Sequence, residues 1–596
     1  MEGDPFFDQG LEYLFGVTSI EDDQPQFRAF WATDRAQEKH AFEQFIDFVL
    51  ERLERFPDLH VYHYAPYEPT ALKRLMGLHA TREDELDHLL RNQILVDLYA
   101  VVRQGLRISQ PSYSIKKLEA FYMDERETDV AEGGDSILAF EKFLDTGDRG
   151  LLEAIERYND DDCRSTWLLH GWLLGRRTEA IEQFGEDIPW RGPPEPREPD
   201  SGPRNEVDEL QAALTEDVAE DRDERDDDAQ ARWLLAQLLD YHRREAKPGW
   251  WAYFERLDAD EETLTERDSE AMGCLAADPG VDPCPLPAPA RSLIHTLRFP
   301  PQDHKIGPGD YIDPATRKVV TVERVDDGEG IVEIKRGTAR RSEPLPRALI
   351  PRGPYDTDEQ QAALRRLARD MLNRGLTADG RYRALRRMIL RDLPRTTARM
   401  RGDVLQAGGF DLEEAKEIAG GLDGSHLFVQ GPPGSGKTFN GAHLICHLLG
   451  RGARVGLASS SHAAIHNLLA DVEDFAGANP PWRGLKKHRG PTETHFRPER
   501  GEDALIANSD RIENFESDEF QLVAGTAWLF SRQELDSKLD YLFVDEAGQL
   551  SLADALAIGT SARNLVLLGD PASARAGFAG GPPVRRRRLG ARAPAR

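Results

Sequence analysis

One segment late in the chain has the residue types and spacing of a phosphate-binding loop. The residues GPPGSGKT follow an apolar stretch, Leu427–Gln430, and precede the helix-forming residues FNGAHLICHLL. Glycines let the backbone N–H groups turn inward, and the start of a helix adds a positive dipole end. A lysine can then reach the β and γ phosphates of ATP, and a threonine hydroxyl can bind Mg²⁺. The expected nucleotide-binding residues are Gly431, Pro432, Pro433, Gly434, Ser435, Gly436, Lys437 and Thr438.

Two acidic residues follow a second apolar stretch. LDYLFV, Leu539–Val544, has the pattern of a buried strand and delivers Asp545 and Glu546 at its carboxyl end. Ligands of open α/β sheets bind at that end of the strands. We expect Asp545 to hold Mg²⁺ together with Thr438, and Glu546 to orient or deprotonate the attacking water.

These acids belong to a segment that resembles a known helicase motif. DEAGQ, Asp545–Gln549, is similar to the DEAxQ form of motif II in superfamily 1 helicases. Three further segments follow the family's order: ASSSHAAIHNLL (Ala458–Leu469) resembles motif Ia, VAGTAWLF (Val523–Phe530) lies where a TAT-like segment belongs, and LVLLGDP (Leu565–Pro571) begins like motif III. The resemblance implies a RecA-like ATPase lobe over residues 411–571.

The same resemblance assigns further roles. Gln549 would couple the nucleotide state to strand movement, and Ser461, His462 and Thr526 would contact the nucleic-acid strand. The chain departs from the family after Pro571, where a Gln-bearing motif III and a second lobe are expected. Residues 572–596 form instead an Arg/Gly/Ala-rich tail of frameshifted appearance. Because the second lobe supplies arginine fingers in the family, we expect the chain to bind nucleotide but to hydrolyse it poorly.

A second set of acidic residues lies near the N-terminus. Tyr158 and Asp162 have a Y-x-x-x-D spacing on an expected helix, so both would project from one face. Residues 1–184 resemble the RNase H-like domain of RecB-family predicted nucleases, in which such a Tyr orients the attacking water of a two-metal site. The resemblance implies Mg²⁺ or Mn²⁺ binding by Glu2, Glu68 and Asp162, with Asp97 as a further candidate.

Two features leave open whether these acidic residues bind a metal ion. Glu68 stands where the class has an Asp, and the leading Asp of the first motif would lie before Glu2, as if the start of the sequence were clipped. The alternative is a set of helix-capping or salt-bridged acids that hold no metal.

Composition limits the class of protein. The 596 residues carry a net charge of −30, contain no apolar run long enough to cross a bilayer and begin without a signal sequence, so we expect a cytoplasmic protein with no membrane partner. Much of the acid is concentrated in Glu216–Asp228, so the net charge does not exclude nucleic acid. The four cysteines have no CxxC spacing, which argues against a zinc ribbon, an iron–sulfur cluster or a disulfide framework.

The order of apolar patterns predicts an α/β multidomain protein. Expected strands at 11–17 and 60–64 alternate with helices in the first domain, and β-rich runs lie within 292–336. The amphipathic stretch Ala231–Arg244 is either a packing helix or a nucleic-acid contact, and the basic stretch Arg381–Arg391 is either a solvated helix or a phosphate-tracking one. The expected parts are an RNase H-like domain at 1–184, an acidic Pro-rich linker at 185–230, a helical segment at 231–290, a small β-rich accessory domain at 291–350, a helical connector at 351–410, the ATPase lobe at 411–571 and the tail at 572–596.

Together these patterns predict an ATP-dependent nucleic-acid helicase or translocase fused to an exonuclease-type domain, acting in DNA repair or end processing. DNA with single-stranded regions is the expected partner, and RNA is a further option. Two other hypotheses stay open: a module that binds nucleotide and nucleic acid without turnover, and a P-loop ATPase that acts on proteins.

Overall fold

The structure is a computed structural model that describes the chain except for residues 8–9, 22–23, 124–132, 191, 193–203, 220, 286–291, 341, 407, 433, 478–479, 489–493, 499 and 571–596. The described residues divide into two compact units, one before and one after Gly202. The predicted tail at 572–596 lies outside the described residues. None of the described helices combines the length and the apolar character needed to cross a membrane.

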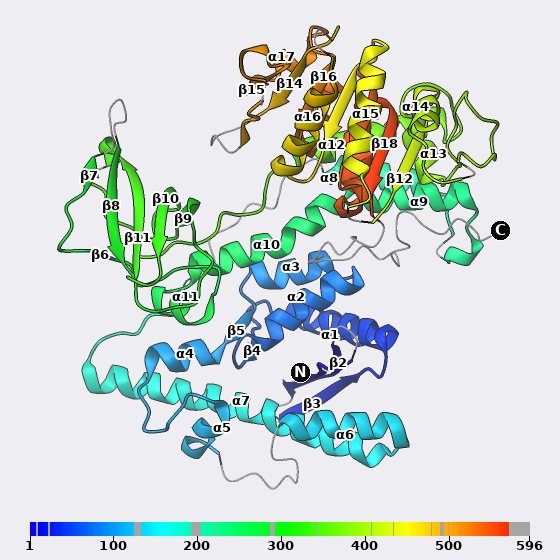
Figure 1. Ribbon diagram of the computed structural model, residues 1–596. Coiled ribbons are helices and arrows are strands. Elements are labelled where there is room, and N and C mark those ends of the chain that lie inside the picture. The colour runs from blue at the N-terminus through cyan, green and yellow to red at the C-terminus, as the bar shows by residue number, and fades with distance from the viewer. Residues whose placement is uncertain are drawn as a thin grey trace. The chain divides into compact units, whose positions relative to one another are not determined.

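The first unit is built on a three-stranded antiparallel sheet. Its strands are β1 (Glu2–Asp4), β2 (Leu11–Glu21) and β3 (Gln24–Trp31), in the order β1-β2-β3, and a separate parallel pair joins β4 (Val61–His63) to β5 (Leu95–Asp97). The helices are α1 (Arg35–Arg55), α2 (Tyr67–His79), α3 (Glu83–Arg91), α4 (Leu98–Gly105), α5 (Ile115–Leu118), α6 (Gly133–Thr146) and α7 (Arg149–Phe184) (Figure 1). The alternation of strands and helices predicted for this part of the chain is therefore present.

Strand β2 is buried on both faces. Leu11, Tyr13 and Leu14 pack in one cluster with Phe140 of α6, and Phe15 lies against Phe45 of α1 with ring centroids 6.1 Å apart. Burial of apolar side chains on both faces supplies the main stabilisation of such a strand. The core of the first unit therefore lies on either side of β2.

The second unit begins with helices in the interval that the sequence predicts as a linker. Helix α8 (Arg204–Thr215) buries Leu210 and Leu214, and contacts α9 (Asp227–Leu239). The last residues of the acidic run begin helix α9. The Asp226 carboxylate caps this helix by accepting a hydrogen bond from Ala229 N at 2.7 Å. Acidic residues at a helix start are favoured by the helix dipole. Part of the interval predicted as a linker is therefore helical.

The expected helical segment and connector lie before and after a small antiparallel sheet along the chain. The helices are α10 (Tyr241–Asp258), α11 (Glu261–Arg267), α12 (Asp358–Arg374) and α13 (Arg383–Ile389). The strands β6 (Ala276–Ala277), β8 (Ser292–Arg298), β11 (Ile331–Gly337), β10 (Lys318–Asp326) and β9 (Gly309–Asp313) follow one another across the sheet, and β7 (Cys284–Pro285) also pairs with β8. The β-rich runs of the sequence form this sheet as predicted.

A seven-stranded parallel sheet completes the second unit. Its order is β12 (His426–Gln430), β18 (Ala562–Gly569), β17 (Leu539–Val544), β13 (Val455–Ala458), β16 (Leu522–Gly525), β14 (Gly484–Lys487) and β15 (Ile506–Ser509). The helices of this part are α14 (Leu412–Gly420), α15 (Lys437–Gly450), α16 (His462–Phe475), α17 (Glu513–Glu516), α18 (Ala527–Phe530) and α19 (Leu552–Gly559). Phe543 and Val566 pack in one cluster with apolar residues of α15 and α16, while α13 and α19 contact β18. This is the RecA-like arrangement expected for the ATPase lobe.

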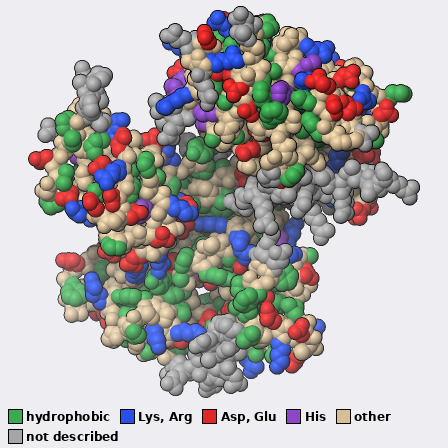
Figure 2. Space-filling view, in the orientation of Figure 1, with side chains coloured by type: hydrophobic (Ala, Val, Ile, Leu, Met, Phe, Trp, Pro, Cys, Tyr) green, Lys and Arg blue, Asp and Glu red, His purple; other side chains and the backbone are tan. Residues whose placement is uncertain are grey.

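Acidic side chains are mixed with basic ones on the visible face of the molecule (Figure 2). Many described Arg side chains form ion pairs with Asp or Glu, as Arg256 does with Asp268 at 2.5 Å. The net charge therefore says little about local binding surfaces.

Candidate functional site

The predicted motif residues of the second unit meet at one edge of the parallel sheet. The phosphate-binding loop follows β12, Ser461 and His462 follow β13, Thr526 follows β16, and Asp545 follows β17. All these strands run parallel. Their carboxyl ends therefore share an edge, which is where open α/β sheets bind ligands.

The phosphate-binding loop is curled around its lysine. Gly434 and Gly436 have φ angles of +77° and +80°, in the left-handed region that glycine adopts without strain. The Lys437 ammonium donates hydrogen bonds to the carbonyl oxygens of Gly431 at 2.6 Å and Pro432 at 2.9 Å. Pro433, also expected in the site, lies outside the described residues. The lysine thus starts α15 with its charge directed into the loop.

A hydroxyl and a carboxylate meet beside the loop. The Thr438 hydroxyl donates to Asp545 Oδ2 at 3.5 Å, and the backbone N–H of Glu546 donates to Asp545 Oδ1 at 2.9 Å. Burial raises the pKa of Asp545, and the nearby charge of Glu546 raises it further. An oxygen pair of this kind fits Mg²⁺, which prefers hard oxygen ligands and would compensate the buried charge.

Glu546 has an unusual backbone conformation for a residue with a side chain. Its φ angle is +54°, and the Ser460 hydroxyl donates to its Oε2 at 3.3 Å. A left-handed conformation outside glycine is uncommon and is found preferentially at functional sites. The strain holds the Glu546 carboxylate near the loop that follows β13, next to Ser461.

Gln549 ends the short helix that follows Glu546. Its backbone N–H donates to the Glu546 carbonyl oxygen at 2.9 Å, within η7 (Ala547–Gln549). The predicted coupling role of its side chain stays a prediction. The residues just before and after it, Ala547, Gly548 and Leu550, line a small pocket.

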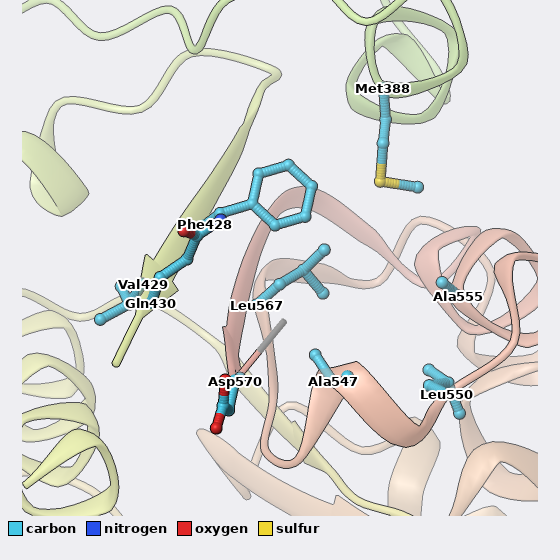
Figure 3. Close-up of a pocket in the computed structure, with 11 residues that line it drawn as sticks. Met388, Phe428, Val429, Gln430, Ala547, Leu550, Ala555, Leu567 and Asp570 are labelled. Carbon is cyan, nitrogen blue, oxygen red and sulfur yellow. The ribbon is translucent and has the colours of Figure 1, made fainter. Parts of the chain in front are cut away.

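This pocket was not foreseen from the sequence. It lies between β12, β18 and α13, and Phe428, Leu567 and Met388 form its apolar walls, with Asp570 at one end (Figure 3). Phe428 and Leu567 belong to strands that are hydrogen-bonded neighbours, in the register Phe428↔Leu567. Apolar strand residues carry no local signal that distinguishes a pocket wall from a core, so the sequence could not identify them.

Two of the predicted strand-contacting residues, Ser461 and His462, have side-chain partners within the protein. The Ser461 hydroxyl caps α16 by accepting from Ala464 N at 3.1 Å, and Thr526 precedes α18. His462 Nδ1 lies 3.0 Å from the ammonium of Lys486, which is fully buried. Burial lowers the pKa of His462 to about 4 and that of Lys486 to about 8. Nucleic-acid contact by these residues stays a prediction, and Lys486 is a charged group of this edge that the motif comparison missed.

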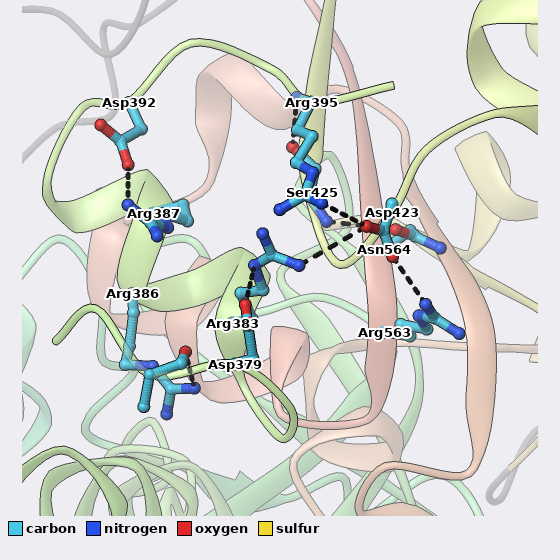
Figure 4. A network of polar contacts seen from close by, with 11 residues as sticks. Asp379, Arg383, Arg386, Arg387, Asp392, Arg395, Asp423, Ser425, Arg563 and Asn564 are labelled. Atoms are coloured by element: carbon cyan, nitrogen blue, oxygen red, sulfur yellow. Dashed lines mark hydrogen bonds and ion pairs between the residues drawn. The ribbon is translucent and has the colours of Figure 1, made fainter. Parts of the chain in front are cut away.

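The basic helix α13 has a structural use. Arg386 is fully buried and pairs with Asp370, while Arg383 contacts Asp379 at 3.1 Å (Figure 4). Arg383 also lies 3.6 Å from Asp423, just before β12. These ion pairs explain the basic stretch of α13 without a nucleic-acid partner. They support neither of the two expectations, a solvated helix or a helix that follows a phosphate backbone.

The acidic residues of the first unit gather where β1, α2 and α7 meet. Tyr158 and Asp162 both lie on α7, as predicted. Glu68 is in the first turn of α2, and its Oε1 lies 3.5 Å from the amino group of Met1. Burial raises the pKa of Glu2, and the charge of Asp162 contributes in the same direction.

Both oxygens of Glu2 are engaged by neutral donors. Asn159 Nδ2 donates to Oε1 at 3.1 Å, and the Ser136 hydroxyl donates to Oε2 at 2.9 Å. A Cβ atom at Gly16 would lie only 1.8 Å from Asn159 Oδ1, so the asparagine depends on a glycine in β2. Asn159 lies next to Tyr158 in the motif and could have been suspected, whereas Ser136 and Gly16 are distant in sequence and carry no signal.

Asp97 and Tyr158 are also held by their surroundings. Asp97 Oδ1 accepts hydrogen bonds from Ala65 N at 2.8 Å and Tyr99 N at 2.9 Å, so it caps α4. Tyr158 is buried, and the ammonium of Lys116 lies 5.2 Å from the centre of its ring. Among the described residues, no three His, Cys, Asp or Glu side chains are arranged to hold a metal ion. Metal binding by Glu2, Glu68 and Asp162 stays a prediction.

Comparison with known proteins identifies the first unit. Residues 1–174 match the family model described as the RNase H superfamily. This part of the chain is therefore an RNase H-like domain, as expected. No curated protein matches the chain.

One solved structure is similar to part of the chain. It is described as the complex structure of arterivirus nonstructural protein 10 (helicase) with DNA, and it has 19% sequence identity and a TM-score of 0.22. The match covers 44% of this chain and 42% of that chain. It thus spans less than half of the viral helicase.

Proposed function

We propose that the protein is an ATP-dependent nucleic-acid helicase or translocase joined to an RNase H-like nuclease-type domain. The observation that carries this proposal is the meeting of Thr438 and Asp545 at 3.5 Å beside the phosphate-binding loop. A hydroxyl after the loop lysine and an acid after a neighbouring buried strand are the two protein ligands that a P-loop enzyme offers to Mg²⁺.

The remaining groups of the site fit the hydrolysis of ATP. Lys437 would exchange its bonds to the loop carbonyls for bonds to the β and γ phosphates, because a phosphate oxygen is the stronger acceptor. Bound Mg²⁺ would offset negative charge on the phosphates. Glu546, held by its strained backbone, would orient or deprotonate the attacking water.

Two independent observations support nucleic acid as the substrate. The first is the order of the segments that resemble helicase motifs, with DEAGQ at Asp545–Gln549 as the most distinctive. The second is the RNase H superfamily match over residues 1–174. DNA with single-stranded regions is the proposed partner, with DNA repair or end processing in the cytoplasm as the proposed setting.

ATPase activity with and without single-stranded DNA tests the proposal. We expect the strand to stimulate hydrolysis, and Lys437→Ala to abolish the stimulated rate. Lys416→Ala is the matched control, because Lys416 lies on α14 and pairs with Glu413 at 2.7 Å. Nucleotide binding without turnover in the wild type would favour the second candidate, a nucleotide-dependent binding module. Absence of any strand binding at low salt would favour an ATPase that acts on proteins.

The nuclease-type domain needs its own test. Degradation of single-stranded and duplex ends should be measured with Mg²⁺ or Mn²⁺, in the wild type and in Asp162→Asn. We expect loss of degradation in the variant if Asp162 binds the metal. Equal degradation by both proteins would show that the acids of this unit are structural.

A further inference from the structure

Two aromatic rings lie in contact on the RNase H-like unit. Tyr62 of β4 and His170 of α7 have ring centroids 4.2 Å apart and an angle of 32° between their planes. Tyr62 is 38% exposed. The exposed ring of His60 lies 6.2 Å from that of Tyr62. The pair therefore presents aromatic surface to solvent.

The pair is mounted on rigid elements. Tyr62 lies in the middle of β4, in register with Val96 of the parallel strand β5. The neighbour of His170 in α7, Leu169, is fully buried with Leu98 and Val102 of α4. Side chains fixed on strands and helices hold their geometry better than side chains on loops. Such rings need little ordering when a ligand stacks on them.

One member of the pair shares helix α7 with Asp162 of the acidic cluster. His170 lies eight residues after Asp162 on α7, which is about 12 Å along a helix. At about 3.4 Å per residue of a stacked strand, this distance corresponds to roughly three or four nucleotides. A strand that reaches the acids could therefore place a base on the rings.

Both rings are neutral at physiological pH. Burial lowers the pKa of His170 and raises the pKa of Tyr62, so neither side chain gains charge near neutrality. A neutral aromatic face stacks on any nucleobase, because every base has a π face. The surface therefore suits a base without selecting its sequence.

We propose that Tyr62 and His170 form a base-stacking subsite for single-stranded nucleic acid on the RNase H-like unit. This inference rests on the proposed nucleic-acid function and adds to it the residues that hold the strand beside the acidic cluster. The subsite is sequence-tolerant. It needs neither the nucleotide of the ATPase lobe nor a metal ion.

Photo-crosslinking of the full chain tests the subsite directly. A single strand carrying 5-iododeoxyuridine is bound in the presence of a chelator and without nucleotide, irradiated, and the crosslinked peptides are identified by mass spectrometry. We expect crosslinks at Tyr62 or His170. Crosslinks confined to the second unit would overturn the subsite and leave the proposed function intact. Absence of crosslinks together with absence of strand-stimulated ATPase would remove both.

Substitutions separate stacking from packing. Tyr62→Leu keeps apolar cover but removes the ring, so we expect the crosslink to disappear and strand binding to weaken about fivefold or more. Tyr62→Phe should retain both. Phe184→Ala is the matched control, because Phe184 is an exposed ring at the far end of α7. The proposal is wrong if Tyr62→Leu and Tyr62→Phe bind the strand equally well. It is also wrong if both variants bind the strand more weakly and both have a lowered unfolding midpoint, because the pair then only packs α7 against β4.

Discussion

Asp545 in the parallel-sheet lobe and Glu2 in the RNase H-like unit are both buried acids, and burial raises the pKa of each. They differ in what their oxygens meet. Glu2 has a neutral donor on each oxygen, from Asn159 and Ser136. Asp545 has a backbone donor on one oxygen, while the other faces the Thr438 hydroxyl at the long distance of 3.5 Å.

The difference separates two uses of a buried carboxylate. Hydrogen bonds to both oxygens compensate a buried charge within the protein, so a cation would have to displace existing donors. A carboxylate with one weakly held oxygen gains more from a cation. Two acids that the sequence predicts as metal ligands can therefore differ in how readily they would bind a metal ion.

The largest expected effect is on ATP hydrolysis. Asp545→Asn removes the charge that would hold Mg²⁺, and loss of roughly 3 kcal/mol of metal-derived stabilisation would lower the strand-stimulated rate more than a hundredfold. Steady-state ATPase over a range of Mg²⁺ concentrations measures it. Glu413→Gln, at an exposed position on α14, should leave the rate unchanged. A rate within threefold of the wild type would show that Asp545 is not a metal ligand.

The next effect concerns the stability of the first unit. Asn159→Leu leaves Glu2 Oε1 buried without its donor, so we expect a loss of about 1–3 kcal/mol in the free energy of unfolding. Gly16→Ala should act in the same direction, because its Cβ would displace the Asn159 side chain. Urea denaturation of the wild type and each variant measures both changes.

The control for these variants lies in the same unit. Gly171 is a glycine of α7 with no atom near its missing Cβ, so Gly171→Ala should stabilise by about 0.5–1 kcal/mol. If Asn159→Leu were as stable as the wild type, the two acids would not differ in the way described.

A smaller expected effect is on how the stability of the first unit depends on pH. A carboxyl whose pKa is raised in the folded state contributes stability below its ordinary pKa, and that contribution is lost as the pH rises through the raised value. Glu2→Gln cannot ionise, so its stability relative to the wild type should increase as the pH rises above the ordinary carboxyl pKa of about 4. Thermal unfolding of the two proteins at several pH values would show it. A constant difference would contradict the raised pKa of Glu2.

The smallest expected effect is on the unfolding temperature of Asp545→Asn in the protein without nucleotide. Its raised pKa means that the charged form costs stability at neutral pH, so Asp545→Asn should unfold at a slightly higher temperature than the wild type. The gain should vanish in acid, where the wild-type carboxyl is protonated. A variant that is less stable at neutral pH would indicate that Asp545 has a structural role instead.

Local spacing explains which parts of the sites could be predicted. Lys437 and Thr438 follow a strand and a glycine-rich loop, and Asp545 follows a strand of six residues, so the sequence around each residue indicates its place. The parallel sheet then brings them together at one edge. The helices and strands of the first unit were predictable for the same reason, because their apolar periodicity is local. The RNase H-like fold was expected from the family resemblance and not from periodicity.

Long-range contacts explain what could not be predicted. Glu2 meets Ser136 and Asn159 across 134 and 157 residues of sequence. The acidic residues before α9 suggest disorder by composition, yet Asp226 begins a helix by capping it. The charge of Arg386 suggests exposure, yet Asp370 neutralises it in the interior. In each case local composition does not identify the group that interacts with the residue.

The position of β12 affects how the protein is made. Among the described strands, β12 lies at the edge of the parallel sheet and pairs only with β18. The residues that join them, such as Ser425 and Asn564, are 139 residues apart in sequence. A ribosome adding about 5–20 residues per second needs on the order of ten seconds for that interval. The strand that precedes the glycine-rich loop therefore has no partner among the described strands until β18 has been synthesised.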